Sequence, residues 1–262
     1  HLINWWRKTP FAQSFGNIPL GVAASLRELN RENPSTHGIL RCFEWPKETS
    51  SQSAAVILQE DAHPHLTSTE NVDQTDVWLA LLEEAEINGP SVGVTTRSRL
   101  LVAEVSVEWS HPPENHGLMR KIFLFRPKPL SGRSLLLAST GGDNYFHWMM
   151  DVLPRVRLLQ EAGISVAGFD HVIVNSVQRA FQRESLAKLG VAPKQIVTLD
   201  QRVRYRCEHL CLPSLPSASG QPSPANVSFL RRAFLDRQPA VAGRKILLGR
   251  EPDKSRQITC WD

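Results

Sequence analysis

The residues of this chain whose types and spacing could do chemistry together lie in one short stretch. They follow one another at helical spacing: Asn144, His147, Asp151 and Arg155. Residues three or four apart share one face of a helix. An imidazole that donates to a carboxylate has its tautomer fixed and its other nitrogen made more basic. The stripe therefore predicts a site, although the spacing also fits a capped helix with a satisfied histidine and a surface ion pair.

A strand, a turn and a helix start are expected to position this stripe. Residues 134–138 form an apolar run typical of a short buried strand. Gly141 and Gly142 form the turn after it, and Asp143 or Asn144 can cap the helix that follows. An α/β protein commonly places a site where a strand gives way to a Gly-rich turn and a helix.

Apolar residues of the same predicted helix fall on its other side and would enter the core: Trp148, Val152, Val156 and Leu159. Pro154 lacks a backbone N–H and disfavours helical angles at Leu153. We therefore expect the helix to kink or restart at Pro154, so the position of Arg155 on the stripe depends on that kink.

The rest of the chain alternates predicted strands and helices. Expected strands cover residues 54–58, the alternating stretch 91–109 with a turn near 96–98, and residues 122–125, 172–175, 196–199 and 207–212. Expected helices cover residues 22–31, 76–87, 178–189 and 225–236. Strand, helix and strand in this order predict an α/β fold with a parallel sheet.

The stretch at residues 144–155 resembles a family signature. It reads Asn-Tyr-Phe-His-Trp-Met-Met-Asp-Val-Leu-Pro-Arg and is similar to the N-Y-x-H-W-x-x-D-x-L-P-R signature of the glycosyltransferase 61 family. The resemblance covers residues 90 to about 256. It implies an inverting transferase that moves a sugar from a nucleotide-sugar donor to a glycan or protein-linked acceptor. Polysaccharide biosynthesis of the capsular type, or O-linked N-acetylglucosaminyl or xylosyl transfer, would be the setting.

The resemblance also implies a domain organisation. It predicts the Rossmann-like first domain of a two-domain, GT-B-type enzyme, with a β-rich lead-in. We expect an N-terminal region of uncertain structure at residues 1–89, the acceptor-side domain at 90–212 and a Pro- and Ser-rich linker at 213–224. Residues 225–262 would begin a second, donor-binding domain that is truncated here, so we expect this chain alone to bind a nucleotide sugar weakly or not at all.

Residue roles follow from the resemblance and from the chemistry of glycosyl transfer. His147 backed by Asp151 is expected to be the catalytic base, or to bind sugar or phosphate. Other residues are expected to hold substrate: Asn144, Tyr145, Arg155, Arg250 and Arg256. Arg250 and Arg256 follow a predicted strand at residues 245–248, and planar guanidinium groups match the oxygens of a diphosphate.

No metal or other cofactor is expected besides the co-substrate, which the resemblance suggests is a uridine-diphosphate sugar. The sequence contains no Asp-x-Asp pair, the usual means of holding a diphosphate through a divalent ion. Two rival functions stay open. One is a metal-dependent hydrolase that combines His147 and Asp151 with His111 or His116. The other is a truncated, non-catalytic relative that binds carbohydrate or serves as a scaffold.

Length and charge bound the remaining classes of protein. Of the 262 residues, 41% are hydrophobic, which is enough for real cores. The net charge of +4 and pI near 9.0 suit an anionic ligand, or a loose peripheral association with a membrane. Lys and Arg are scattered along the sequence, so we expect no nucleic-acid partner.

The cysteines favour a reducing compartment. They are Cys42, Cys207, Cys211 and Cys260. Cys207, His209 and Cys211 would share one face of a strand, but we expect buried thiols there and not zinc. Nothing demands a disulfide, and no apolar run reaches the roughly 18 residues of a membrane span. We expect a cytoplasmic enzyme of bacterial type, or one in the Golgi or endoplasmic-reticulum lumen if the source is eukaryotic.

Overall fold

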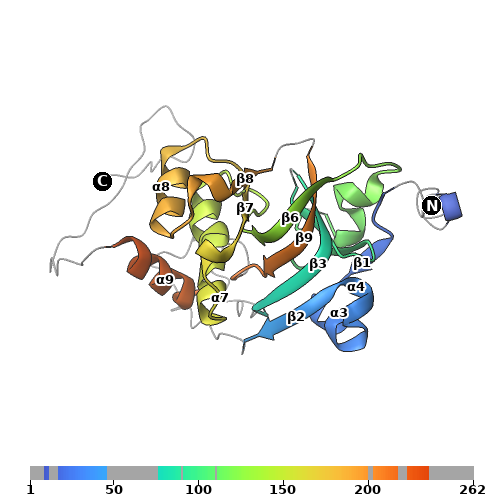
Figure 1. The fold of residues 1–262 in the computed structure, drawn as a ribbon, viewed down its shortest axis with the longest axis horizontal. Coiled ribbons are helices and arrows are strands. Elements are labelled where there is room, and N and C mark those ends of the chain that lie inside the picture. The colour runs from blue at the N-terminus through green and yellow to red at the C-terminus, as the bar shows by residue number, and fades with distance from the viewer. Residues whose placement is uncertain are drawn as a thin grey trace, which may run out of the picture.

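The computed structural model describes residues 9–11, 17–45, 76–89, 91–109, 111–199, 203–217 and 223–235. In this part of the chain, one sheet forms the centre and helices pack against it (Figure 1). The fold is mixed α/β, as expected. The predicted strands at residues 54–58 and 245–248, together with Arg250 and Arg256, lie outside the described residues.

The sheet has nine strands in the described ranges, ordered β1-β5-β4-β3-β9-β6-β7-β8, with β2 also paired to β3. Their bounds are β1 (Gly21–Ala23), β2 (Ile39–Glu44), β3 (Trp78–Asn88), β4 (Gly93–Thr95), β5 (Leu100–Val102), β6 (Lys128–Leu136), β7 (His171–Val174), β8 (Ile196–Thr198) and β9 (Arg204–Pro213). The four neighbours β9, β6, β7 and β8 run parallel, while β3 is antiparallel to β9. The expected strands at 172–175 and 196–199 therefore lie in one common sheet, as predicted.

Short helices connect the strands. They are α3 (Leu26–Glu32), α4 (Pro34–His37), α6 (Tyr145–His147), α7 (Arg155–Glu161), α8 (Ala180–Lys188) and α9 (Pro224–Phe234), with single turns η1 (Pro113–Asn115), η2 (Gly117–Arg120), η3 (Trp148–Val152), η4 (Val166–Gly168) and η5 (Pro193–Gln195). The helices expected at 178–189 and 225–236 are confirmed. The helix expected at 22–31 starts only at Leu26, because Val22 pairs with Leu101 in the sheet.

Both faces of the parallel strands are buried, which explains their continuous apolar runs. Leu135 and Leu137 point into a core shared with α7, α8 and α9. Leu136 and Ala138 point to the opposite face, into a core shared with β3 and β4. The predicted strand at 134–138 is thus confirmed, although β6 begins earlier and ends at Leu136.

The helix predicted at residues 76–87 is wrong, because Trp78–Asn88 form the long central strand β3. Its Leu, Ala and Glu residues are good helix formers, but β3 has β9 on one side and β2 and β4 on the other. Burial between these strands overrides helix propensity. Even Glu86 is buried, where it pairs with Arg204 and Arg206.

The strand predicted at residues 122–125 is also wrong. These residues form an irregular segment between η2 and β6, with no strand pairing in the structure. By contrast, β4 and β5 confirm the two strands expected within 91–109, and the chain turns between them near residues 96–98 as predicted.

The described residues around the expected domain boundaries pack into the sheet, and the expected division into domains stays a prediction. A boundary near residue 90 falls inside the β3–β4 hairpin. Residues 214–217 of the expected linker are mostly buried, and Asn226 of α9 donates to the carbonyl of Pro216 at 3.2 Å. Phe229 of α9 lies in the same core as α7. In the described residues, α9 is therefore packed against the α/β sheet.

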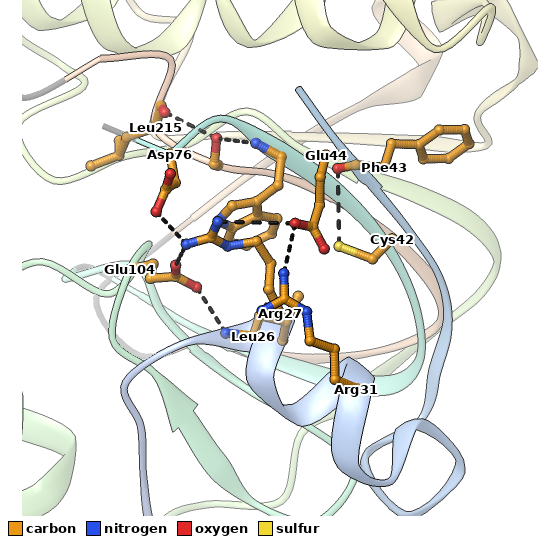
Figure 2. Close-up of polar contacts among 11 residues, drawn as sticks. Leu26, Arg27, Arg31, Cys42, Phe43, Glu44, Asp76, Glu104 and Leu215 are labelled. Atoms are coloured by element: carbon orange, nitrogen blue, oxygen red, sulfur yellow. Dashed lines mark hydrogen bonds and ion pairs between the residues drawn. The ribbon is translucent and has the colours of Figure 1, made fainter. Parts of the chain in front are cut away.

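A group of charges holds α3 against the sheet edge (Figure 2). Arg27 donates to Asp76 at 2.5 Å and lies 3.7 Å from Glu104 and 4.0 Å from Glu44. Glu104 accepts from the backbone N–H of Leu26 at 2.8 Å. Burial raises the pKa of the Glu104 carboxyl, against the opposing effects of the Leu26 hydrogen bond and the Arg27 charge. One cation thus joins the helix to residues from three other segments.

The cysteines in the described part of the chain are free thiols. Burial raises the pKa of both Cys207 and Cys211 to about 12, as expected for unreactive core thiols. The prediction that they share a face is wrong, because Cys211 enters the core under α7 and Cys207 enters the opposite one. Cys260 lies outside the described residues.

Candidate functional site

The site begins at a tight double turn where β6 ends. Gly141 has φ of 74°, a conformation that glycine adopts without a steric cost. The N–H of Gly142 donates to the carbonyl of Ser139 at 3.0 Å, and that of Asn144 donates to Gly141 at 2.8 Å. The turn predicted from the glycine pair is confirmed, and it delivers the helix start to the carboxyl end of the parallel strands.

Asn144, and not Asp143, caps the helix. Its side chain accepts from the N–H of Phe146 at 2.9 Å. After one α-helical turn, η3 is π-helical, and the N–H of Leu153 bonds to the carbonyl of Trp148 at 3.0 Å. The helix restarts as α7 directly after Pro154. The predicted interruption at Pro154 is therefore confirmed.

His147 and Asp151 form the predicted pair. Nδ1 of His147 lies 2.7 Å from Oδ2 of Asp151. The Asp151 side chain is almost fully buried, at 3% exposure, whereas that of His147 is 20% exposed. A carboxylate in this position accepts from Nδ1–H, which makes Nε2 the nitrogen suited to proton exchange.

Arg155 lies in the interior behind this pair. Its side chain is fully buried, and Nη1 donates to the carbonyl of Ala138 at 2.9 Å. Its Nε and Nη2 have no hydrogen-bond partner among the described residues. Burial lowers the pKa of Arg155 to about 10, and the negative charge of Asp151 opposes that shift. Arg155 is thus placed to balance the Asp151 charge from inside the protein.

Aromatic rings surround the imidazole. Trp109 is half exposed, and its ring centroid lies 4.8 Å from that of His147 at an angle of 33°. Phe146 meets the imidazole edge-on at 5.4 Å. Thr140 Oγ1 donates to the carbonyl of Val107 at 2.5 Å, which ties the Trp109 segment to the turn. A Cβ on Gly141 would lie 2.4 Å from the Trp109 ring, so only glycine fits there.

The remaining predicted substrate residues are distributed differently. Asn144 is exposed at the helix cap. Tyr145 is 61% exposed and packs edge-on against Phe181 of α8 at 5.0 Å. Arg250 and Arg256 lie outside the described residues, so their predicted role stays a prediction.

Asn175 is a site residue that sequence reasoning missed. Its amide donates to the carbonyl of Ser139 at 2.8 Å and accepts from the Ser139 N–H at 3.1 Å. These two hydrogen bonds, called here the Ser139–Asn175 clamp, fix the end of β6 to the end of β7. The signal in the sequence was an amide directly after a buried parallel strand, at the sheet edge where α/β proteins place ligands.

A polar cavity of about 630 Å³ opens beside this clamp, at the carboxyl ends of β7 and β8. It is lined by Asp143, Asn175, Ser176, Val177, Gln178, Arg179, Thr198 and Leu199. Arg179 is exposed there and forms no ion pair with the described residues. The cavity has room and hydrogen-bonding groups for a polar ligand, and Arg179 supplies a positive charge.

Replacing Gly142 with alanine is expected to lower the free energy of unfolding by about 1–3 kcal/mol. A Cβ at this position would lie 2.1 Å from Oδ1 of Asn175 and 3.0 Å from the carbonyl of Ser139, so the clamp would have to open. Gly168→Ala is the matched control, because its nearest neighbour, Arg133, would be 3.4 Å away. Urea denaturation measures both; equal losses would contradict the role assigned to the clamp.

Metal ligation has no candidate cluster in the described ranges, since no three His, Cys, Asp or Glu side chains are grouped to hold an ion. His116, a residue of the hydrolase hypothesis, is buried, accepts from the N–H of Leu118 at 3.1 Å and lies 3.7 Å from Glu108. Burial lowers the pKa of His116, against the charge of Glu108. His111 is exposed near η1.

Comparisons of the chain with protein-family models, with curated proteins and with solved structures found no match. The resemblance of residues 144–155 to a transferase signature therefore stays a prediction. Among the helices in the described ranges, none combines the length and the apolar character needed to cross a membrane.

Proposed function

We propose that this chain is the acceptor-side part of an inverting, GT-B-type glycosyltransferase that moves a sugar from a nucleotide-sugar donor to a glycan or glycoprotein acceptor. The single observation that carries the proposal is the His147–Asp151 pair at 2.7 Å, set under the exposed ring of Trp109. An oriented imidazole is a suitable base for a sugar hydroxyl. An exposed indole beside it offers a flat apolar surface to the C–H face of a sugar ring.

The chemistry is a single displacement. The acceptor hydroxyl gives its proton to Nε2 of His147 while its oxygen bonds to the anomeric carbon. The bond from that carbon to the diphosphate oxygen breaks on the opposite face, and the diphosphate departs with the bonding electrons. Asp151 accepts from Nδ1–H and stabilises the imidazolium that forms. The configuration at the anomeric carbon inverts because only one displacement occurs.

Arg155 acts through Asp151 in this proposal. The negative charge of the buried Asp151 carboxylate must already be stabilised before His147 takes up a proton and becomes positive. The fully buried guanidinium supplies a fixed positive charge on the other side of Asp151. Arg155 is thus a positioning residue, and the substrate contact expected of it from the sequence is replaced by contact with the Ala138 carbonyl.

The arrangement of strands supports the finer fold assignment within this proposal. Four parallel strands with helices between β6, β7 and β8 are what a Rossmann-like domain would require. The polar cavity at the ends of β7 and β8, with Arg179 at its rim, is where we propose that an anionic part of a substrate binds. The free thiols are compatible with the reducing cytoplasm, where we propose that the enzyme works.

A panel of nucleotide sugars tested against glycan acceptors examines the proposal directly when it is run with the two-domain enzyme that we propose, and the product anomer is determined by nuclear magnetic resonance. An inverted anomeric linkage is the expected result, and retention would contradict the single displacement. The exposed Trp109 favours one alternative, a protein that binds carbohydrate without catalysis. Calorimetric binding of an acceptor glycan without turnover of any donor would support that alternative.

Transfer is expected to keep its rate after treatment with EDTA. The sequence contains no Asp-x-Asp pair to hold a metal-bound diphosphate, and guanidinium groups can neutralise a diphosphate directly. A metal-dependent transferase run in parallel controls for complete chelation. Activity that is lost and returns only when Mn²⁺ or Mg²⁺ is added would refute this prediction.

A further inference from the structure

Three large apolar side chains project from the segment that joins η2 to β6. Ile122 is 60% exposed, Phe123 57% and Phe125 76%. A group of exposed side chains of this size commonly marks a site of interaction with another molecule or with a membrane. In the described part of the chain, no other stretch of four residues carries three exposed large apolar side chains.

Positive charges flank these side chains on both sides. The exposed cations of the segment are Arg120, Lys121, Arg126 and Lys128. No acidic residue occurs between Gly117 and Lys128. Within the described ranges, none of the four cations takes part in an ion pair. The segment, named here the basic–aromatic loop (residues 120–128), therefore combines apolar tips with uncompensated positive charge.

The loop is held in place, so the exposure of its tips is built into the fold. Leu124, between the two phenylalanines, turns inward and packs with the cluster of Leu101 and Leu118. The carbonyl of Phe125 accepts from Nη1 of Arg204 at 2.5 Å. Arg204 is in turn fixed by its buried ion pair with Glu86 of β3. Because Leu124 points inward, the backbone directs its neighbours Phe123 and Phe125 outward.

We propose that the basic–aromatic loop binds the surface of an anionic phospholipid bilayer. Phe and Ile side chains gain free energy when they enter the boundary between headgroups and acyl chains, and nearby Lys and Arg are attracted to anionic headgroups. The loop offers both kinds of group on one short, anchored segment. This proposal does not depend on the proposed glycosyl transfer.

A lipid surface fits the loop better than single-stranded nucleic acid does. Nucleic acid requires aromatic faces that are open for base stacking. Phe123 and Phe125 pack edge-to-face at 5.9 Å and 82°, so the edge of one ring covers the face of the other. Ile122 has no aromatic face to offer. Insertion into lipid needs exposed apolar volume and not parallel ring faces.

The position of the loop leaves the candidate site open to water. The loop ends where β6 begins, and the turn that carries His147 follows where β6 ends. β6 has nine residues, and an extended strand rises about 3.3 Å per residue, which separates its two ends by roughly 25 Å. A bilayer bound at the loop would therefore hold the site above the membrane without covering it.

Sedimentation with lipid vesicles tests the proposal on the full chain. We expect binding to vesicles of phosphatidylcholine with phosphatidylserine, little binding to phosphatidylcholine alone, and weaker binding as the ionic strength rises. The variant Phe123→Ser/Phe125→Ser is expected to lower the partition coefficient at least about tenfold. Lys121→Gln/Arg126→Gln is expected to lower it about tenfold or more on anionic vesicles only.

Matched control variants lie on other surfaces. Leu40→Ser removes an apolar side chain that is 56% exposed on β2, and Arg231→Gln/Arg232→Gln removes two exposed charges from α9. Both should bind vesicles like the parent chain. Lys121→Gln/Arg126→Gln changes only exposed side chains. It therefore still tests the proposal if Phe123→Ser/Phe125→Ser fails to fold.

Three outcomes would overturn the proposal. The first is no binding to anionic vesicles at low ionic strength. The second is vesicle binding that the control variants weaken as much as the loop variants do, which would place the contact elsewhere. The third is loop-dependent binding to a single-stranded oligonucleotide that is stronger than binding to the vesicles, which would make the loop a nucleic-acid site.

Discussion

In the two-domain glycosyltransferase that we propose, replacing His147 with alanine is expected to lower sugar transfer by about a hundredfold or more with little loss of thermal stability. Loss of a general base typically costs a factor of this size. The imidazole is partly exposed, and its partners include the Asp151 carboxylate and two rings at the surface. Little buried apolar surface is lost when it is removed. The measurement is initial rate of transfer alongside the melting temperature.

Chemical rescue makes this test specific for proton transfer. Added imidazole should restore part of the activity of His147→Ala, because a small base can occupy the space under Trp109. His209→Ala is the control, since His209 lies in β9 with its side chain 48% exposed. A drop in melting temperature for His147→Ala as large as that for a core variant would count against a catalytic role, as would full activity.

The predictions that succeeded at the site depend on local geometry. His147 and Asp151 are four residues apart in one helix, so their spacing alone places the two side chains together. Asn144 caps that helix for the same local reason. Trp109 and Asn175 come from segments that only the tertiary fold brings to the turn. No periodicity in a single sequence indicates such contacts.

Arg155 shows where helical spacing stops being a guide. The π-helical turn η3 closes its hydrogen bond one residue later than an α turn does. Residues after it are rotated away from the stripe that an uninterrupted α-helix would form. Arg155 therefore points to the Ala138 carbonyl in the interior, and not along the exposed face with His147.

The wrong predictions about the fold have a common cause, because the sequence does not indicate which segments are buried by pairing with distant strands. Residues 76–87 contain good helix formers, yet they form the centre of the sheet because strands distant in sequence pair with both edges. Residues 122–125 have strong β propensity but no strand to pair with. Strands of the parallel part, such as β7, were predictable because their apolar runs are short and bounded by turns.

Trp148→Ala is expected to lower the free energy of unfolding by about 3–5 kcal/mol. A loss of this size is a large part of the total free energy of unfolding of a marginally stable domain. Trp148 is fully buried between the sheet and α8, and it is among the largest side chains of the core. It lies edge-on to Phe181 at 6.2 Å. The exposed Trp109 gives a matched control: Trp109→Ala removes the same side chain from the surface and should change stability far less. Equal losses would contradict this distinction.

The indole N–H of Trp148 separates the packing contribution from the hydrogen-bond contribution. It donates to Oγ of Ser185 in α8 at 2.9 Å, inside the core. Trp148→Phe loses this bond and part of the volume, while Ser185→Ala leaves the N–H buried without its partner, at a cost of about 1–3 kcal/mol. The double variant should therefore be less destabilised than the sum of the two single variants. Urea denaturation of all four proteins gives the coupling free energy, and strict additivity would show that the hydrogen bond does not join the helix that carries His147 to α8.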